Sequence, residues 1–119
     1  MTSFARRIRL PVSNELDAAR FHEALGAPIN AFRHLERAHV LGQASTREHV
    51  RVHVAMLAWA LRQRRAGEVL SQLWRIVAAV LLTPWGAVPP GNTGGSDVPS
   101  WKPLPIPADL QRVIDATRA

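Results

Sequence analysis

Cysteine is absent from this sequence of 119 residues. Without thiols the chain cannot form a disulfide, a zinc–thiolate site or an iron–sulfur cluster, and it has no thiol nucleophile. The absence also fits a reducing compartment. Any catalytic or metal-binding group must therefore come from the other polar side chains.

Tyrosine is absent too, and lysine occurs once, so the net charge of +6 rests on fourteen arginines. The arginines are scattered except for two clusters, at residues 6–9 and 62–65. Neither cluster is interleaved with the aromatic side chains on which single-stranded nucleic acid stacks. We therefore expect no nucleic-acid partner, and the excess of arginine over lysine is typical of a GC-rich genome.

The sequence also lacks a long apolar run. Its most apolar segment, residues 73–82, is interrupted by Arg75 and is shorter than the roughly 20 residues that a membrane span needs. The first residues show neither an apolar stretch nor a cleavage site of the kind found in a signal peptide. We expect a cytoplasmic protein without a membrane partner, and the length predicts a single domain covering residues 1–119.

Apolar spacing and helix-stop residues predict an all-α fold. We expect a loosely held basic arm (1–12), four helices (13–83), a Pro/Gly-rich tail (84–106) and a short closing helix (107–117). Ser13 or Asn14 is the expected cap of the first helix. The fourth helix is apolar almost all round, which predicts that it is the most buried. The tail contains most of the prolines, so we expect no regular element there.

The two halves of the helical region are weakly similar in sequence pattern, because each half predicts a helical hairpin with small residues at the turn. This is similar to a pair of tetratricopeptide-type repeats, although the full repeat signature is absent. Two hairpins are fewer than a solenoid needs, so we expect a closed bundle. The four tryptophans are expected to anchor the core and the tail, with Trp85 and Trp101 holding the tail to the bundle.

Four of the five histidines lie between His34 and His53. His49 and His53 are one helical turn apart and point the same way. A short loop joins their helix to the preceding one, so His39 is expected to approach both from an antiparallel neighbour. His34 lies about 140° from His39 on the helical wheel and is left out of this group. His39, His49 and His53 together predict a site for a divalent metal such as zinc, iron or copper.

Glu36 is the nearest carboxylate, one turn before His39. It is predicted to be a metal ligand or a general base, with Glu36 and His39 as the candidate catalytic residues. The spacing of Glu36 and His39 also occurs in di-iron bundles, but the second such pair is missing. A metal-free polar pocket and a purely structural hydrogen-bond network remain open alternatives. The sequence names no reaction; an enzyme built on these residues would perform hydrolysis or proton transfer.

The segment Pro89–Gly95 can make successive turns whose backbone N–H groups point inward and hold an anion. It lacks the lysine-containing ending of a nucleotide-binding loop. A rigid turn is the simpler interpretation. In a combined interpretation the segment folds over the histidines as a lid, and Asn92 and Thr93 face the pocket as ligand-binding residues.

The motifs His34–Gln43, His49-x-x-x-His53, Gly91–Gly95 and the following Pro-x-Pro-x-Asp-Leu together resemble a family of small bacterial proteins known only as a domain of unknown function. The resemblance covers about residues 13–116 and implies that the tail belongs to the fold. It implies no activity. We therefore expect first a small-molecule ligand at the histidines. The alternative is a tetratricopeptide-like module that binds a partner peptide. A homodimer is left open.

Overall fold

The computed structural model describes residues 3–119, and these residues form an all-helical structure. The predicted fold class is confirmed. The elements, in order, are α1 (Phe4–Ala24), α2 (Pro28–Gly42), α3 (Thr46–Arg62), α4 (Ala66–Leu82), a 3-10 turn η1 (Thr83–Trp85) and α5 (Ala108–Arg118).

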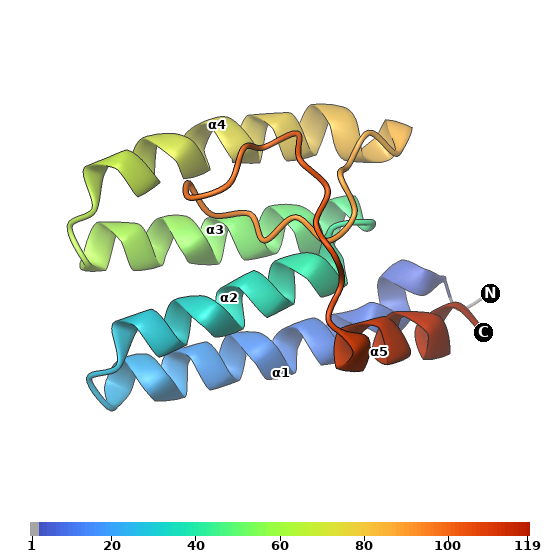
Figure 1. Ribbon diagram of the computed structural model, residues 1–119, viewed down its shortest axis with the longest axis horizontal. Helices are drawn as coiled ribbons and strands as arrows, with labels where there is room; N and C mark the ends of the chain where they lie inside the picture. Colours follow the sequence, from blue (N-terminus) through green and yellow to red (C-terminus); the bar gives the residue numbers. More distant parts are fainter. Residues whose placement is uncertain (1–2) are drawn as a thin grey trace.

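The helices pack in sequence order, with α1 against α2, α2 against α3 and α3 against α4 (Figure 1). After η1 the tail runs back along α3 and α4 before it reaches α5, which packs on α1 and α2. One apolar core joins α1, α2, α3 and α5; its larger members are Ile8, Val12, Leu16, Phe32, Leu35, Met56, Trp59, Leu110 and Ile114.

The expected basic arm is wrong, because α1 begins at Phe4 and is capped by the side chain of Ser3 rather than by Ser13 or Asn14. Pro11 lies inside this helix. An interior proline removes a backbone hydrogen bond and costs about 3 kcal/mol. The burial of Ile8 and Val12, both 0% exposed, offsets this cost by placing the first turns of α1 in the core.

The expectation that α4 is the most buried helix is also wrong. Its buried side chains are Gln72, Arg75 and Ala79, whereas most of its large apolar side chains lie on the exposed surface. The reason is its position at the edge of the bundle, where it packs against α3 and η1 (Figure 1). Among the described residues, the segment Ala66–Trp85 is long and apolar enough to cross a membrane by length and composition, with a mean hydropathy of 1.3.

The burial of the tryptophans differs from the prediction. Trp59 is buried in the core, and its indole N–H donates to the carbonyl of Pro28, 3.0 Å away. Trp74, Trp85 and Trp101 are largely exposed. Trp85 and Trp101 therefore do not anchor the tail; hydrogen bonds from Gln43, Gln72 and Arg75 hold it instead.

Candidate functional site

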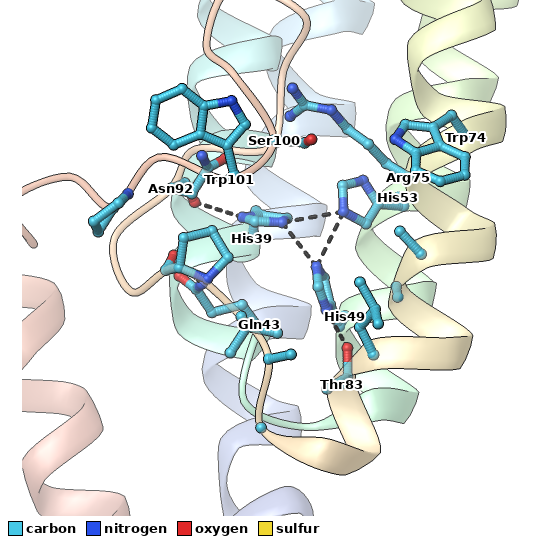
Figure 2. Close-up of a pocket in the computed structure, with 18 residues that line it drawn as sticks. His39, Gln43, His49, His53, Trp74, Arg75, Thr83, Asn92, Ser100 and Trp101 are labelled. Carbon is cyan, nitrogen blue, oxygen red and sulfur yellow. Dashed lines mark hydrogen bonds between the residues drawn. The ribbon is translucent and has the colours of Figure 1, made fainter.

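The imidazoles of His39, His49 and His53 meet at one point between α2 and α3 (Figure 2). The Nε2 atom of His39 lies 3.0 Å from that of His49 and 3.1 Å from that of His53, and the Nε2 atoms of His49 and His53 are 3.1 Å apart. The predicted convergence of these three side chains is therefore confirmed. It follows from the one-turn spacing on α3 and from the short α2–α3 loop, which sets the two helices antiparallel.

Each of the three rings is held from behind by an oxygen atom on its Nδ1 side. The Nδ1 atom of His39 lies 2.6 Å from the backbone carbonyl of Asn92, that of His49 lies 2.7 Å from Oγ1 of Thr83, and that of His53 lies 2.6 Å from Oε1 of Gln72. Three different segments thus fix the orientation of the rings.

These partners determine where two of the ring protons lie. A carbonyl oxygen only accepts, so Nδ1 of His39 must be the donor. The amide nitrogen of Gln72 donates to Oε2 of Glu68 and to the carbonyl of Gly94, which leaves Oε1 of Gln72 as an acceptor for Nδ1 of His53. In a neutral imidazole with Nδ1 protonated, Nε2 carries a lone pair. The Nε2 lone pairs of His39 and His53 therefore face each other.

Burial keeps the three histidines neutral. Their exposed fractions are 3%, 7% and 2% for His39, His49 and His53. Desolvation, together with the repulsion that a protonated His53 would exert, lowers the pKa of His49 to about 3, and desolvation lowers the pKa of His53 to about 4. Desolvation also lowers the pKa of His39 well below its usual value, reinforced by the repulsion that protonation of the other two histidines would cause. A neutral imidazole is the form that binds a metal.

The ring positions fit a metal ion. Around a tetrahedral zinc with Zn–N distances of about 2.0–2.1 Å, ligand nitrogens lie about 3.3 Å apart, slightly farther than the separations of 3.0 Å and 3.1 Å in this cluster. The histidine cluster could therefore hold a metal ion after a small outward movement of the rings. Metal-binding histidines also usually donate their second ring nitrogen to an oxygen, as His39 and His53 do.

A pocket of about 500 Å³ opens beside the histidines, and all three contribute to its wall. Polar groups come from Gln43, Arg75, Asn92 and Ser100. The rest of the wall is mainly apolar and includes Trp74, Ala78, Leu82, Val88, Pro103 and Trp101. A ligand in this pocket would thus contact the histidine cluster and an apolar surface together (Figure 2).

The Gly-rich segment packs directly on the cluster. A Cβ atom at Gly94, whose φ is +86°, would lie 2.6 Å from Cδ2 of His39, so only glycine allows this approach. The side chain of Asn92 accepts from the backbone N–H of Gly94 and donates to the carbonyls of Pro99 and Lys102. Asn92 lines the pocket, and its side chain holds the tail together. Thr93 does not line this pocket, and its buried hydroxyl has no hydrogen-bond partner among the described residues.

Glu36 lies apart from the histidine cluster. Its carboxylate accepts a hydrogen bond from Nη1 of Arg33 at 2.9 Å, and it does not line the pocket. Burial raises its pKa, although the pairing with Arg33 acts in the opposite direction. His34 is also outside the site, with Nδ1 2.8 Å from Oε2 of Glu15 on α1.

Sequence reasoning missed three residues that complete the site. Gln72 and Thr83 orient two of the histidines, and Arg75 lines the pocket. A signal for them exists, because Gln72 and Arg75 are the polar residues within an otherwise apolar segment, residues 69–82 (with Ser71). Burying such side chains requires polar partners, which the histidine cluster and the tail supply.

Comparison with known proteins gives a family but no activity. No curated protein and no solved structure matches the chain. The family described as "Protein of unknown function (DUF3703)" matches residues 6–114, which include every helix that forms the site. This agrees with the resemblance carried by the histidine and glycine motifs. The chain therefore belongs to the DUF3703 family of proteins of unknown function.

Proposed function

We propose that this protein binds one divalent metal ion through the Nε2 atoms of His39, His49 and His53, and that the remaining coordination position faces a small-molecule ligand in the adjoining pocket. One observation carries the proposal: three buried Nε2 atoms lie within 3.1 Å of one another, while oxygen atoms occupy the Nδ1 side of every ring.

The arrangement is costly without a cation. Lone pairs on adjacent Nε2 atoms repel each other, and the buried rings resist protonation because desolvation lowers their pKa values. One hydrogen bond from the third ring would relieve only part of this repulsion. A divalent ion converts the three lone pairs into ligand bonds, which is why the convergence favours a metal site over a peptide-binding module with separated histidines.

Zinc is the first candidate, with iron and copper as alternatives that imidazole ligands also suit. Three histidines with an open position form the ligand set of catalytic rather than structural zinc sites. Because all three ligands are neutral, a bound ion would keep its full charge and would lower the pKa of a water in the open position. This supports hydrolysis as the reaction class. The separation of Glu36 from the pocket fits a mechanism in which the metal, not a carboxylate, activates the water.

Elemental analysis of the untagged protein tests the metal site. We expect about one equivalent of metal in the wild type, loss of that metal in the His49→Ala, His53→Ala double variant, and retention in a His22→Ala, His34→Ala double variant as the matched control. The control removes the same number of imidazoles from positions that stack on each other outside the pocket.

A second measurement guards against misfolding of the variants. Cobalt titration of the metal-free wild type should give the visible absorption of tetrahedral nitrogen coordination, and the control variant should give the same spectrum. Wild-type protein that takes up neither zinc, iron, copper nor cobalt while remaining helical by circular dichroism would overturn the proposal. The histidines would then form a structural network.

A further inference from the structure

Arg75 is a buried cation whose guanidinium is hydrogen-bonded to no carboxylate among the described residues, although the charges of Glu68 and Asp97 act on it from farther away. It is 7% exposed, and its Nη2 donates to the backbone carbonyl of Val98. Among residues 3–119 it forms no ion pair. A guanidinium carries five N–H donors in a planar fork that matches a carboxylate, so most of its donors have no protein acceptor. The unused donors of this buried guanidinium lie in a pocket wall and suit a carboxylate that is not part of the chain.

The side chain of Arg75 lies in the wall of the histidine pocket. Figure 2 shows it reaching across the pocket toward Ser100, above His53. His39, His49 and His53 line the same pocket. An anion paired with Arg75 would therefore lie next to the proposed metal position.

The remainder of the pocket wall defines the kind of anion. Arg75 is the only permanently charged residue among those that line the pocket, which suits a ligand with a single negative charge. Trp74 and Trp101 line the pocket from opposite sides of the view in Figure 2. Ala78 and Leu82 add to the apolar wall. A phosphate dianion would have one cation and few hydrogen-bond donors to bind in this pocket. In a carboxylate with an apolar body, the carboxylate would pair with the cation and the body would contact the apolar wall.

We propose that this pocket binds a small carboxylate with an apolar or aromatic body, whose carboxylate pairs with the Arg75 guanidinium and whose body lies against Trp74 and Trp101. The inference rests on the proposed function in one respect, because a carboxylate oxygen next to Arg75 would also reach the open position on the metal. Pairing with Arg75 itself does not require the metal.

The test uses benzoate as the probe, with neutral benzamide and inorganic phosphate for comparison. Binding is followed by isothermal calorimetry and tryptophan fluorescence on metal-free and zinc-loaded protein. We expect saturable binding of benzoate, weaker binding of the other two, and at least about tenfold weaker benzoate binding in Arg75→Met. Arg75→Lys should retain part of the affinity. Arg47→Met, which removes an exposed arginine outside the pocket, should bind like the wild type.

Failure of this inference is distinguishable from failure of the metal site. Arg75-dependent benzoate binding by a protein that takes up no metal would support the inference and overturn the metal proposal. A metal-loaded protein that binds no benzoate, binds phosphate more tightly, or binds benzoate equally in Arg75→Met would overturn the inference. Metal content measured on the same Arg75 variants shows whether the histidine cluster has survived the substitution.

A separate observation concerns the outward face of α4, made up of Leu70, Leu73, Trp74, Val77, Val80 and Leu81. Each of these side chains is between 49% and 68% exposed. Leu70, Leu73, Val77 and Val80 follow the alternating three- and four-residue spacing of a helix–helix seam. Taking roughly 150–250 Å² for a fully exposed large apolar side chain, these six residues expose about 600 Å².

We infer that a second copy of this chain covers this face, in a symmetric dimer formed by two α4 helices. The exposed area is at the upper end of the roughly 300–600 Å² of the largest patch on a typical monomer and approaches the roughly 800 Å² that each partner buries in a standard interface. A helix lying on a membrane would need cations flanking its apolar face. The only cation between residues 69 and 82 is Arg75, which is turned inward.

Sedimentation velocity of the full chain tests this dimer. We expect a dimer for the wild type, a monomer for Leu73→Glu and for Val80→Glu, and a dimer for Leu10→Glu, a matched substitution of an exposed leucine on α1. Circular dichroism confirms that each variant is helical. A wild type that stays monomeric at high concentration, or one that is monomeric and co-sediments with phosphatidylglycerol vesicles, would overturn the inference.

Discussion

Replacing Gly94 with alanine perturbs the histidine cluster without altering any candidate ligand. The new Cβ would lie 2.6 Å from Cδ2 and 2.7 Å from Cγ of His39, whereas ordinary contact begins at 3.4 Å. The φ of +86° holds Gly94 in a conformation that other residues rarely adopt. Because the contact is with a ring held between the tail and α3, His39 has to retreat from the Asn92 carbonyl or the loop has to open.

Two costs follow from this clash. The left-handed backbone conformation costs about 1–2 kcal/mol with a Cβ present. Loss of the 2.6 Å hydrogen bond to the Asn92 carbonyl leaves a buried polar group unpaired, at about 1–3 kcal/mol. Displacing the Nε2 atom of His39 from the other two also weakens metal binding. By comparison with the loss of outer-shell hydrogen bonds at other metal sites, we expect a decrease in affinity of about 10–100-fold.

Gly26→Ala is the matched control, because Gly26 has a φ of +79° and no atom within 4 Å of its Cβ position. It carries the same backbone strain far from the site. Urea denaturation of the metal-free proteins should show a larger loss of unfolding free energy for Gly94→Ala, and zinc competition titration should show weakened binding for Gly94→Ala alone. Equal zinc affinity in the two variants would refute the argument that the tail holds His39 in position.

Three further predictions concern the histidines and their neighbours. In metal-free protein the pKa values of about 3 for His49 and about 4 for His53 lie below the ordinary 6.5, so the unfolded state binds more protons as the pH falls. Stability is therefore complete above pH 6.5 and decreases from there toward pH 4, by about 1.4 kcal/mol per pH unit for each histidine; a flat profile in urea denaturation would contradict this. Gln72→Leu removes the acceptor for His53 and should weaken zinc binding about 10–100-fold in a competition titration; an unchanged affinity would show that this hydrogen bond does not support the site. Glu36→Gln should leave the zinc affinity unchanged, because Arg33 rather than the cluster holds this carboxylate; a large loss of affinity would restore Glu36 to the site.

The histidine cluster was predictable because it depends on local geometry. His49 and His53 are one turn apart on a helix whose start is marked by Ser45, and the preceding helix ends only a few residues earlier. Helical period and loop length therefore place His39 opposite the pair. Glu36 shows the limit of this reasoning, since its spacing from His39 suggested a shared site but Arg33, three residues earlier, holds its carboxylate.

The start of the chain was not predictable from local signals. Pro11 and the arginines before it are typical of a loose segment, and they led to an expected boundary at residue 12. In the fold α5 returns to α1, and Arg7 donates from Nε to the carbonyl of Thr117. Ile8 and Val12 are buried in the same core as Leu110 and Ile114 of α5. A tertiary contact between residues so far apart in the sequence gives no local signal in the first twelve residues.

The polar side of α4 faces inward and its apolar side faces outward because the histidine cluster requires hydrogen-bond partners. A hydrophobic helix is normally expected to turn its apolar side inward. The imidazoles of His49 and His53 and the tail form hydrogen bonds with the inward face of α4 and η1. The side chains that form these bonds are Gln72, Arg75 and Thr83, and the small side chain of Ala79 lies between them in the sequence. These four positions are spaced by three or four residues, so they form one face of a helix. Polar residues at helical spacing within an apolar helix therefore identify its inner face here, and they leave its apolar face to a partner outside the chain.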